Sequence, residues 1–290
     1  MKAGRMKDQN MGGEILKGKI KRKQIAGMNL IYKWHTFEYF LDAMEELGFE
    51  SIFLWGGPPH FDCDYLSYPK CGRIQKAVRH HGLEITGFLV TGSNYRYQIA
   101  TEEPDQREHV FNYFRNGILA CEELGSPCIS MNSGWGYQDH DREEAFKRSR
   151  DMISRLCEEA GKHHVRIVLE SLKSCETNLV VTMEDMKRME REVNHPAFSI
   201  MADTGAIGYN KERLEDWFDC FGKQIRSIHF VDGMHLTWGD GKSGLDDMIK
   251  SIITHEYQGC LALETSGSAY LPDPIEADRK AMRILSPFLE

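Results

Sequence analysis

The feature that most constrains the fold of this 290-residue chain is one unit that recurs from residue 24 to the C-terminus. A short apolar run, rich in β-branched residues, ends at Gly, Ser, Asp or Asn, and an amphipathic stretch follows it. Runs of the first kind predict β-strands, and stretches of the second kind predict helices. The apolar runs are residues 25–32, 51–55, 85–90, 127–131, 166–170, 198–202, 225–231 and 260–264.

Eight strand–helix units in a chain of this length predict an α/β fold with a single (β/α)8 TIM barrel. An open, doubly wound sheet is the competing arrangement, but no Gly-x-Gly-x-x-Gly loop follows the first predicted strand. We therefore expect residues 24–290 to form one barrel-shaped catalytic domain. Residues 1–23 precede it as a basic, solvated tail that includes the run from Lys17 to Lys23.

The charge balance and the cysteine pattern restrict the class of protein. A net charge of −8 argues against nucleic acid and against an anionic membrane surface as partners. No apolar stretch is long enough to span a bilayer, and no secretory leader is evident. The eight cysteines include no Cys-x-x-Cys pair, which favours reduced, packed thiols. These features predict a cytoplasmic enzyme for a small molecule.

Four consecutive predicted strands end in side chains that can bind a metal ion. These are Glu170, Asp203, His229 and Glu264. Taken singly, each could be a salt-bridge, capping or packing residue, but the active site of a barrel lies at the C-terminal ends of its strands. Three carboxylates with one imidazole suit a single divalent cation, with manganese favoured and magnesium or cobalt as alternatives. The absence of cysteine from the set argues against structural zinc.

The segments around these residues resemble the metal-binding segments of the xylose-isomerase-like barrel family, and their spacing is similar to that of its ketose 3-epimerase branch. The quoted segments are Val168-Leu-Glu170-Ser171, Met201-Ala-Asp203, Ile228-His229-Phe-Val-Asp232 and Leu263-Glu264-Thr265. A further segment, Leu54-Trp55-Gly-Gly-Pro-Pro-His60, is similar to one in fructoselysine 3-epimerases. The resemblance extends over nearly the whole chain from residue 25.

This resemblance implies metal-dependent epimerisation or isomerisation of a ketose or a substituted fructosamine. Glu170 and Glu264 would be the catalytic pair that removes and returns a proton beside the ketone. Glu176 would contact the substrate, although an exposed loop residue is the alternative. Two positions depart from many ketose epimerases: Ala206 stands where they carry histidine, and His235 where they carry arginine. His235 is therefore a candidate substrate contact for a bulkier sugar.

Two other histidines are candidate substrate-binding residues on loops at the same rim. His60 follows the second strand, and His140 ends a loop that contains Trp135 and Tyr137. These aromatic rings could stack on a sugar or on an aryl group, and ordinary loop packing is the alternative.

Other members of the same superfamily suggest two alternative functions. The chain is also similar to the catalytic subunit of C-glycoside deglycosidases, which implies a lyase that cleaves 3-oxo-C-glycosides and a small β-rich partner subunit. DNA repair at abasic sites is disfavoured by the acidic charge. The resemblance further implies a homo-oligomer that associates through helical faces.

Overall fold

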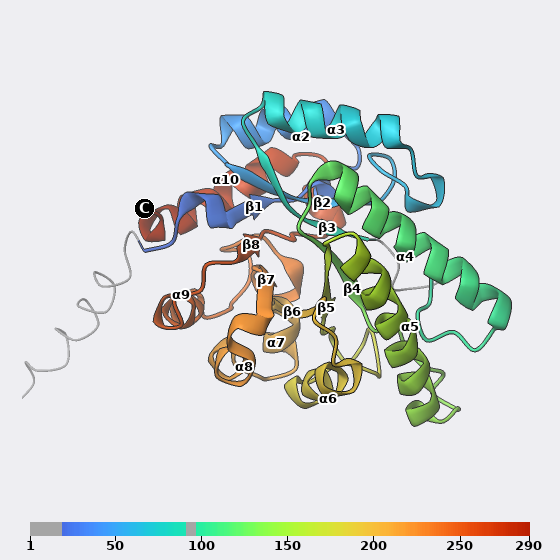
Figure 1. The fold of residues 1–290 in the computed structure, drawn as a ribbon. Helices are drawn as coiled ribbons and strands as arrows, with labels where there is room; N and C mark the ends of the chain where they lie inside the picture. Colours follow the sequence, from blue (N-terminus) through green and yellow to red (C-terminus); the bar gives the residue numbers. More distant parts are fainter. Residues whose placement is uncertain (1–18, 91–96) are drawn as a thin grey trace, which may run out of the picture.

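A computed structural model describes residues 19–90 and 97–290 and contains a closed barrel of eight parallel strands (Figure 1). Neighbours in the chain are neighbours in the sheet, and β1 closes the barrel by pairing with β8. This confirms the predicted (β/α)8 fold. The strands are β1 (Ile25–Gly27), β2 (Ser51–Trp55), β3 (Glu84–Leu89), β4 (Cys128–Asn132), β5 (Arg166–Glu170), β6 (Phe198–Asp203), β7 (Ile225–His229) and β8 (Cys260–Ala262).

Helices lie between the strands and cover the outside of the barrel (Figure 1). They are α2 (Phe37–Glu46), α3 (Tyr68–His80), α4 (Pro104–Leu124), α5 (Arg142–Lys162), α6 (Met183–Val193), α7 (Thr204–Tyr209), α8 (Leu214–Phe221), α9 (Leu245–Thr254) and α10 (Pro274–Leu285). Several ends follow local chemistry: the Thr36 hydroxyl accepts a hydrogen bond from the Tyr39 N–H at the start of α2. Gly125, with φ of +72°, ends α4 in the left-handed conformation.

The first strand is shorter than the apolar run that predicts it. The run continues to Tyr32, but β1 ends at Gly27 and residues Asn29–Tyr32 form a 3-10 helix. The Asn29 side chain explains the change, because its Oδ1 accepts from the Trp55 N–H at 2.7 Å and its Nδ2 donates to the Trp55 carbonyl at 3.1 Å. A side chain thus replaces the backbone pairing with β2, and the main chain is free to turn.

Two other segments depart from a simple alternation of one strand and one helix. Two helices follow β6: α7 starts immediately after the strand, and α8 begins at Leu214. The eighth strand ends at Ala262, because the Glu264 N–H turns back to donate to the Ala262 carbonyl at 3.0 Å. Glu264 therefore lies just beyond its strand.

A small cluster of buried apolar side chains fills the interior of the barrel. The interior cluster consists of Ala26, Met28, Phe53, Cys128, Val168, Met201, Cys260 and Ala262. A larger apolar layer packs between the strands and the surrounding helices. All eight cysteines are free thiols and six of them are buried, as the sequence predicts.

The two ends of the described chain meet on one side of the barrel (Figure 1). The N–H groups of Lys19 and Ile20 donate to the Phe288 carbonyl at 2.9 and 3.0 Å, and Ile20 is buried. Lys19 and Ile20 of the predicted basic tail therefore bond the C-terminal segment, and residues 1–18 lie outside the described residues. Among the described residues, each helix is too short or too polar to cross a membrane.

Candidate metal centre

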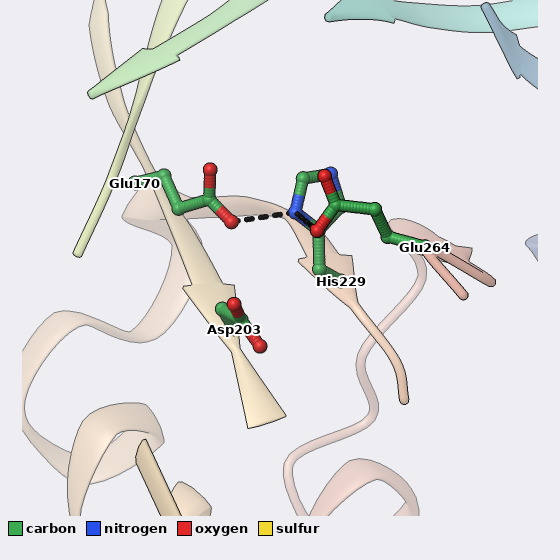
Figure 2. A group of neighbouring side chains, drawn as sticks. All are labelled: Glu170, Asp203, His229 and Glu264. Atoms are coloured by element: carbon green, nitrogen blue, oxygen red, sulfur yellow. Dashed lines mark hydrogen bonds and ion pairs between the residues drawn. The ribbon is translucent and has the colours of Figure 1, made fainter. Parts of the chain in front are cut away.

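The barrel brings the four predicted metal ligands together at one rim (Figure 2). One ligand atom from each of Glu170, Asp203, His229 and Glu264 lies within 4.8 Å of the others. All four residues are buried: 0% of Asp203 and His229 and at most 8% of the two glutamates is exposed. Such a set of hard oxygen donors with one imidazole is therefore shielded from solvent.

Strand register accounts for this convergence. Asp203 at the end of β6 pairs with His229 at the end of β7, and Glu170 at the end of β5 pairs with Met201. Asp203 is also the N-cap of α7, because its Oδ1 accepts from the N–H groups of Gly205 and Ala206 at 2.7 and 3.2 Å. The cap fixes the carboxylate and leaves the second oxygen, Oδ2, directed to the cluster.

The ion-pair distances inside the cluster are short. His229 Nδ1 lies 2.6 Å from Glu170 Oε1 and 3.0 Å from Glu264 Oε2. In Figure 2 the two carboxylates approach this imidazole from different sides, and Asp203 lies near them. His235 adds a second imidazole, with Nε2 at 3.2 Å from Asp203 Oδ2 and Nδ1 at 3.0 Å from Glu264 Oε2.

Burial and these ion pairs shift the pKa values in opposite directions. Burial raises the pKa of Glu170 to about 7, although His229 opposes the shift. Burial also acts to raise the pKa values of Asp203 and Glu264, but the neighbouring imidazoles outweigh it and hold both below their ordinary values. For His229 and His235 burial lowers the pKa, and the facing carboxylates outweigh it and raise both values. The carboxylates therefore require positive charge close to them.

The cluster fits a divalent cation. Three buried polar atoms, Asp203 Oδ2, His229 Nε2 and Glu264 Oε2, have no hydrogen bond of suitable geometry. Buried polar atoms without a well-directed hydrogen bond are costly, and a bound ion would satisfy them. The donor set of three carboxylates and one imidazole is also the type that holds manganese, magnesium or cobalt.

A single aspartate organises the loop that carries His235. Asp232, which is 3% exposed, accepts four backbone N–H groups: Oδ1 accepts from Gly233 and Ser243, and Oδ2 accepts from Gly239 and Gly241, at 2.8–3.1 Å. Burial raises the pKa of Asp232, but these four donors outweigh it and lower that pKa. Sequence reasoning did not identify this role, although the closely spaced Gly239, Gly241 and Ser243 are its signal.

Lys173 is a second residue that sequence reasoning missed. It lies three residues beyond Glu170, is 5% exposed, and its ammonium contacts Glu176 Oε1 at 2.9 Å. The other Glu176 oxygen accepts from the Lys173 N–H at 3.2 Å. Burial lowers the pKa of Lys173, but Glu176 and, more weakly, Asp203 outweigh it and raise that pKa. The ammonium therefore lies within electrostatic range of the cluster, and Glu176 turns back to hold it.

The other two predicted contact residues occupy different surroundings. His60 is buried, with Nδ1 at 3.0 Å from Asn29 Nδ2 and Nε2 at 2.9 Å from the His35 carbonyl. Both ring nitrogens are thus used within the chain. His140 is exposed and pairs with Glu102 at 3.0 Å. Neither histidine belongs to the cluster of the four predicted ligands, whereas His235 contacts two of them.

A comparison with known protein families shows to which family the chain belongs. Residues 41–287 match the xylose isomerase-like TIM barrel family. The chain belongs to this family. The match spans the helices and strands from α2 to α10 and includes all four clustered residues.

Several relatives within the family are sugar epimerases. The chain is 25% identical to the fructoselysine 3-epimerase of Shigella flexneri over 248 residues, which are 84% of this chain and 89% of that protein. The D-psicose 3-epimerase of Clostridium cellulolyticum has a similar fold, with a TM-score of 0.77 and 14% identity over 92% of this chain and 99% of its own. The 3-keto-D-glucoside 4-epimerase of Escherichia coli gives a TM-score of 0.77 and 16% identity, over 90% of this chain and 98% of its own. At these identities the two solved structures establish a common fold.

Proposed function

We propose that the chain is a divalent-metal-dependent epimerase or isomerase that moves a proton at the carbon beside a sugar ketone. The observation that carries this proposal is the convergence of Glu170, Asp203, His229 and Glu264 within 4.8 Å at the ends of four strands. The curated relatives, a fructoselysine 3-epimerase and a D-psicose 3-epimerase, support a sugar substrate. Manganese remains the favoured ion, with magnesium or cobalt as alternatives.

The four clustered side chains would hold the ion, and the ion would polarise the ketone and ease removal of the neighbouring proton. Glu170 and Glu264 come from different sides of the cluster, so one carboxylate can accept the proton and the other can return it. Proton return to the opposite face would invert the carbon. His235 contacts both Asp203 and Glu264, which makes it a candidate partner for a sugar hydroxyl bound at the cluster.

The epimerase reaction is favoured over the lyase reaction. The relatives named above are epimerases, so they give no support to cleavage of 3-oxo-C-glycosides. A partner subunit is consequently not required by the proposal. Association into a homo-oligomer stays a prediction from the family resemblance.

Deuterium exchange tests the proposal directly. The manganese-loaded protein is incubated in deuterated water with free ketoses, fructosamines and 3-oxo-glucosides, and exchange of the C–H proton is followed by proton NMR. We expect exchange with at least one sugar, and its loss in both Glu170→Gln and Glu264→Gln. Glu215→Gln, on the outer surface of α8, is the matched control and should exchange like the parent.

Metal content is measured on the same samples. If the parent protein holds manganese and exchanges no proton with any sugar of the panel, the proposal is wrong. Release of an aglycone from a 3-oxo-glycoside would instead assign the lyase reaction.

A further inference from the structure

Helices α2 and α3 lie side by side on the outside of the barrel, and a second group of possible metal ligands links them (Figure 1). The group consists of Glu38 and Asp42 on α2 and of His81, the C-cap of α3. One ligand atom from each residue lies within 4.8 Å of the other two. Among the residues that the structure describes, this group and the metal centre are the two clusters that bring three or more such atoms together.

The imidazole of His81 is buried although it lies between two surface helices. Its side chain is 6% exposed, and its Nδ1 lies 2.9 Å from the carbonyl oxygen of Ala77. A carbonyl group can only accept, so Nδ1 carries the ring hydrogen and Nε2 of the neutral ring carries a lone pair. Metal-binding histidines almost always fix their tautomer in this way, by donating the other ring N–H to a carbonyl or a carboxylate.

The atoms that face His81 Nε2 are acceptors as well. Nε2 lies 3.1 Å from Asp42 Oδ1 and 3.7 Å from Glu38 Oε1. Within the described part of the chain, no N–H or O–H group is found that donates to this nitrogen. A buried acceptor that meets only other acceptors is unfavourable. A cation or a proton must therefore lie between Nε2 and the two carboxylates.

The charge of α2 also favours a cation at this position. Glu38 and Asp42 are four residues apart on one face of the helix, where two like charges destabilise it. The helix carries two further acids, Glu45 and Glu46, and no Lys, Arg or His. A divalent ion between Glu38 and Asp42 would offset the repulsion between them.

His255 shows what the same arrangement looks like with a single acid. Its Nδ1 lies 2.9 Å from the Ser251 carbonyl oxygen, and its Nε2 lies 3.0 Å from Asp219 Oδ1. The His255 side chain is 22% exposed and belongs to neither of the two clusters of the described residues. The second carboxylate and the deeper burial therefore distinguish His81, and His255 provides a natural control.

We propose that Glu38, Asp42 and His81 bind a zinc ion that ties α2 to α3. Zinc takes imidazole nitrogen together with carboxylate oxygen, and a water molecule can complete its tetrahedral shell at this exposed edge. The imidazole disfavours calcium and magnesium, which prefer oxygen ligands, and zinc binds such a site more tightly than manganese. The site shares no residue with the metal centre, so the inference does not rest on the proposed function.

The test dialyses the full chain against manganese and micromolar free zinc, and both metals are then measured by atomic absorption. Their sum per chain is the readout, because it does not depend on which ion fills the metal centre. We expect two ions per chain in the parent, one in His81→Ala, and two in the matched control His255→Ala. Asp42→Asn keeps the size of the side chain and should weaken zinc binding at least about tenfold in a calorimetric titration. Far-ultraviolet circular dichroism verifies that each variant is folded.

One ion per chain in both the parent and His81→Ala would overturn the inference and would assign a proton, in place of zinc, to Nε2. A second ion that persists in His81→Ala would also overturn it, because that ion lies elsewhere. Failure of the metal centre gives a different result, one ion in the parent and none in His81→Ala. Zinc should also slow amide hydrogen exchange in α2 and α3 of the parent, and an equal effect in His81→Ala would refute the link between the helices.

Discussion

Asp232 provides the sharpest test of how this chain builds its site. The variant Asp232→Asn keeps the shape of the side chain but replaces one carboxylate oxygen with an amide NH2 group. This group is a donor and faces two backbone N–H donors, from which it cannot accept. Two of the four backbone hydrogen bonds are therefore lost, and a hydrogen bond to a charged acceptor contributes about 1.5–3 kcal/mol. We expect the free energy of unfolding to fall by roughly 3–6 kcal/mol. For a chain of this size the melting temperature should fall by about 5–10 °C.

The same variant should affect the position of His235. Met234 and His235 have φ of 61° and 58°, a left-handed conformation that side chains rarely adopt, so the loop must be held by its surroundings. Release of the loop should weaken substrate binding, while manganese binding stays close to that of the parent, because three of the candidate ligands are the last residues of strands and Glu264 lies two residues past β8.

Chemical denaturation and manganese titration are the assays for this prediction. Asp240→Asn is the matched control, since Asp240 lies on the same loop but is partly exposed and pairs with Lys280 at the surface. Its loss should cost no more than about 1 kcal/mol. If the Asp232→Asn variant is as stable as Asp240→Asn, the hydrogen bonds of Asp232 do not stabilise this loop.

Three further predictions follow from the buried charges. Manganese at about 100 times its dissociation constant should raise the free energy of unfolding by about 2.7 kcal/mol, measured by denaturation with and without a chelator. Glu170→Gln should lose most of this increment. An unchanged increment in this variant would contradict the assignment of Glu170 as a ligand. Burial raises the pKa of Asp278 from 3.8 to about 7, although the Tyr32 hydroxyl donates to this carboxyl group at 2.7 Å. Between these two pH values the folded protein keeps a proton that the unfolded chain loses. The free energy of unfolding therefore falls as the pH rises from about 4 to about 7. Asp278→Asn does not titrate, so up to about 4 kcal/mol of this pH dependence should be absent from the variant. If the variant and the parent differ in the free energy of unfolding by the same amount at pH 5 and pH 8, this prediction is refuted. Glu176→Gln leaves the buried Lys173 ammonium without its partner and should lower the free energy of unfolding by about 1–3 kcal/mol. The double variant Lys173→Met with Glu176→Gln should lose less stability than the sum of the two single variants. Additive losses in this double-mutant cycle, measured by chemical denaturation, would show that the two side chains do not interact.

The barrel and the grouping of its four candidate ligands could be predicted because both depend on strand order. Once eight strand–helix units are recognised, the ends of consecutive strands must lie at one rim. Glu170, Asp203 and His229 are the last residues of three consecutive strands. Glu264 lies two residues past its shorter strand and still joins the cluster. The pattern of apolar runs along the sequence was therefore sufficient to predict that these four residues lie at one rim.

Loop residues could not be placed in this way, because their positions depend on contacts between distant segments. Asn29 ends β1 by bonding Trp55, which is not evident from the apolar run that includes both the strand and the following turn. Lys173 is surrounded by polar loop residues in the sequence, and only the folded loop buries its ammonium against Glu176. His235 was singled out by resemblance, but its contacts with Asp203 and Glu264 require the turn that Asp232 holds.

This division has a consequence for how the site can change. The four candidate ion-binding side chains are placed by strand order, so we expect changes to them to act on metal affinity and on the proposed reaction together. The loops after the strands, such as residues 135–138, residues 174–178 and the loop that carries His235, can change without moving the cluster, so we expect substitutions there to alter the sugar that is bound. Metal affinity and substrate preference should therefore separate in mutants according to whether the altered residue lies at a strand end or in a loop.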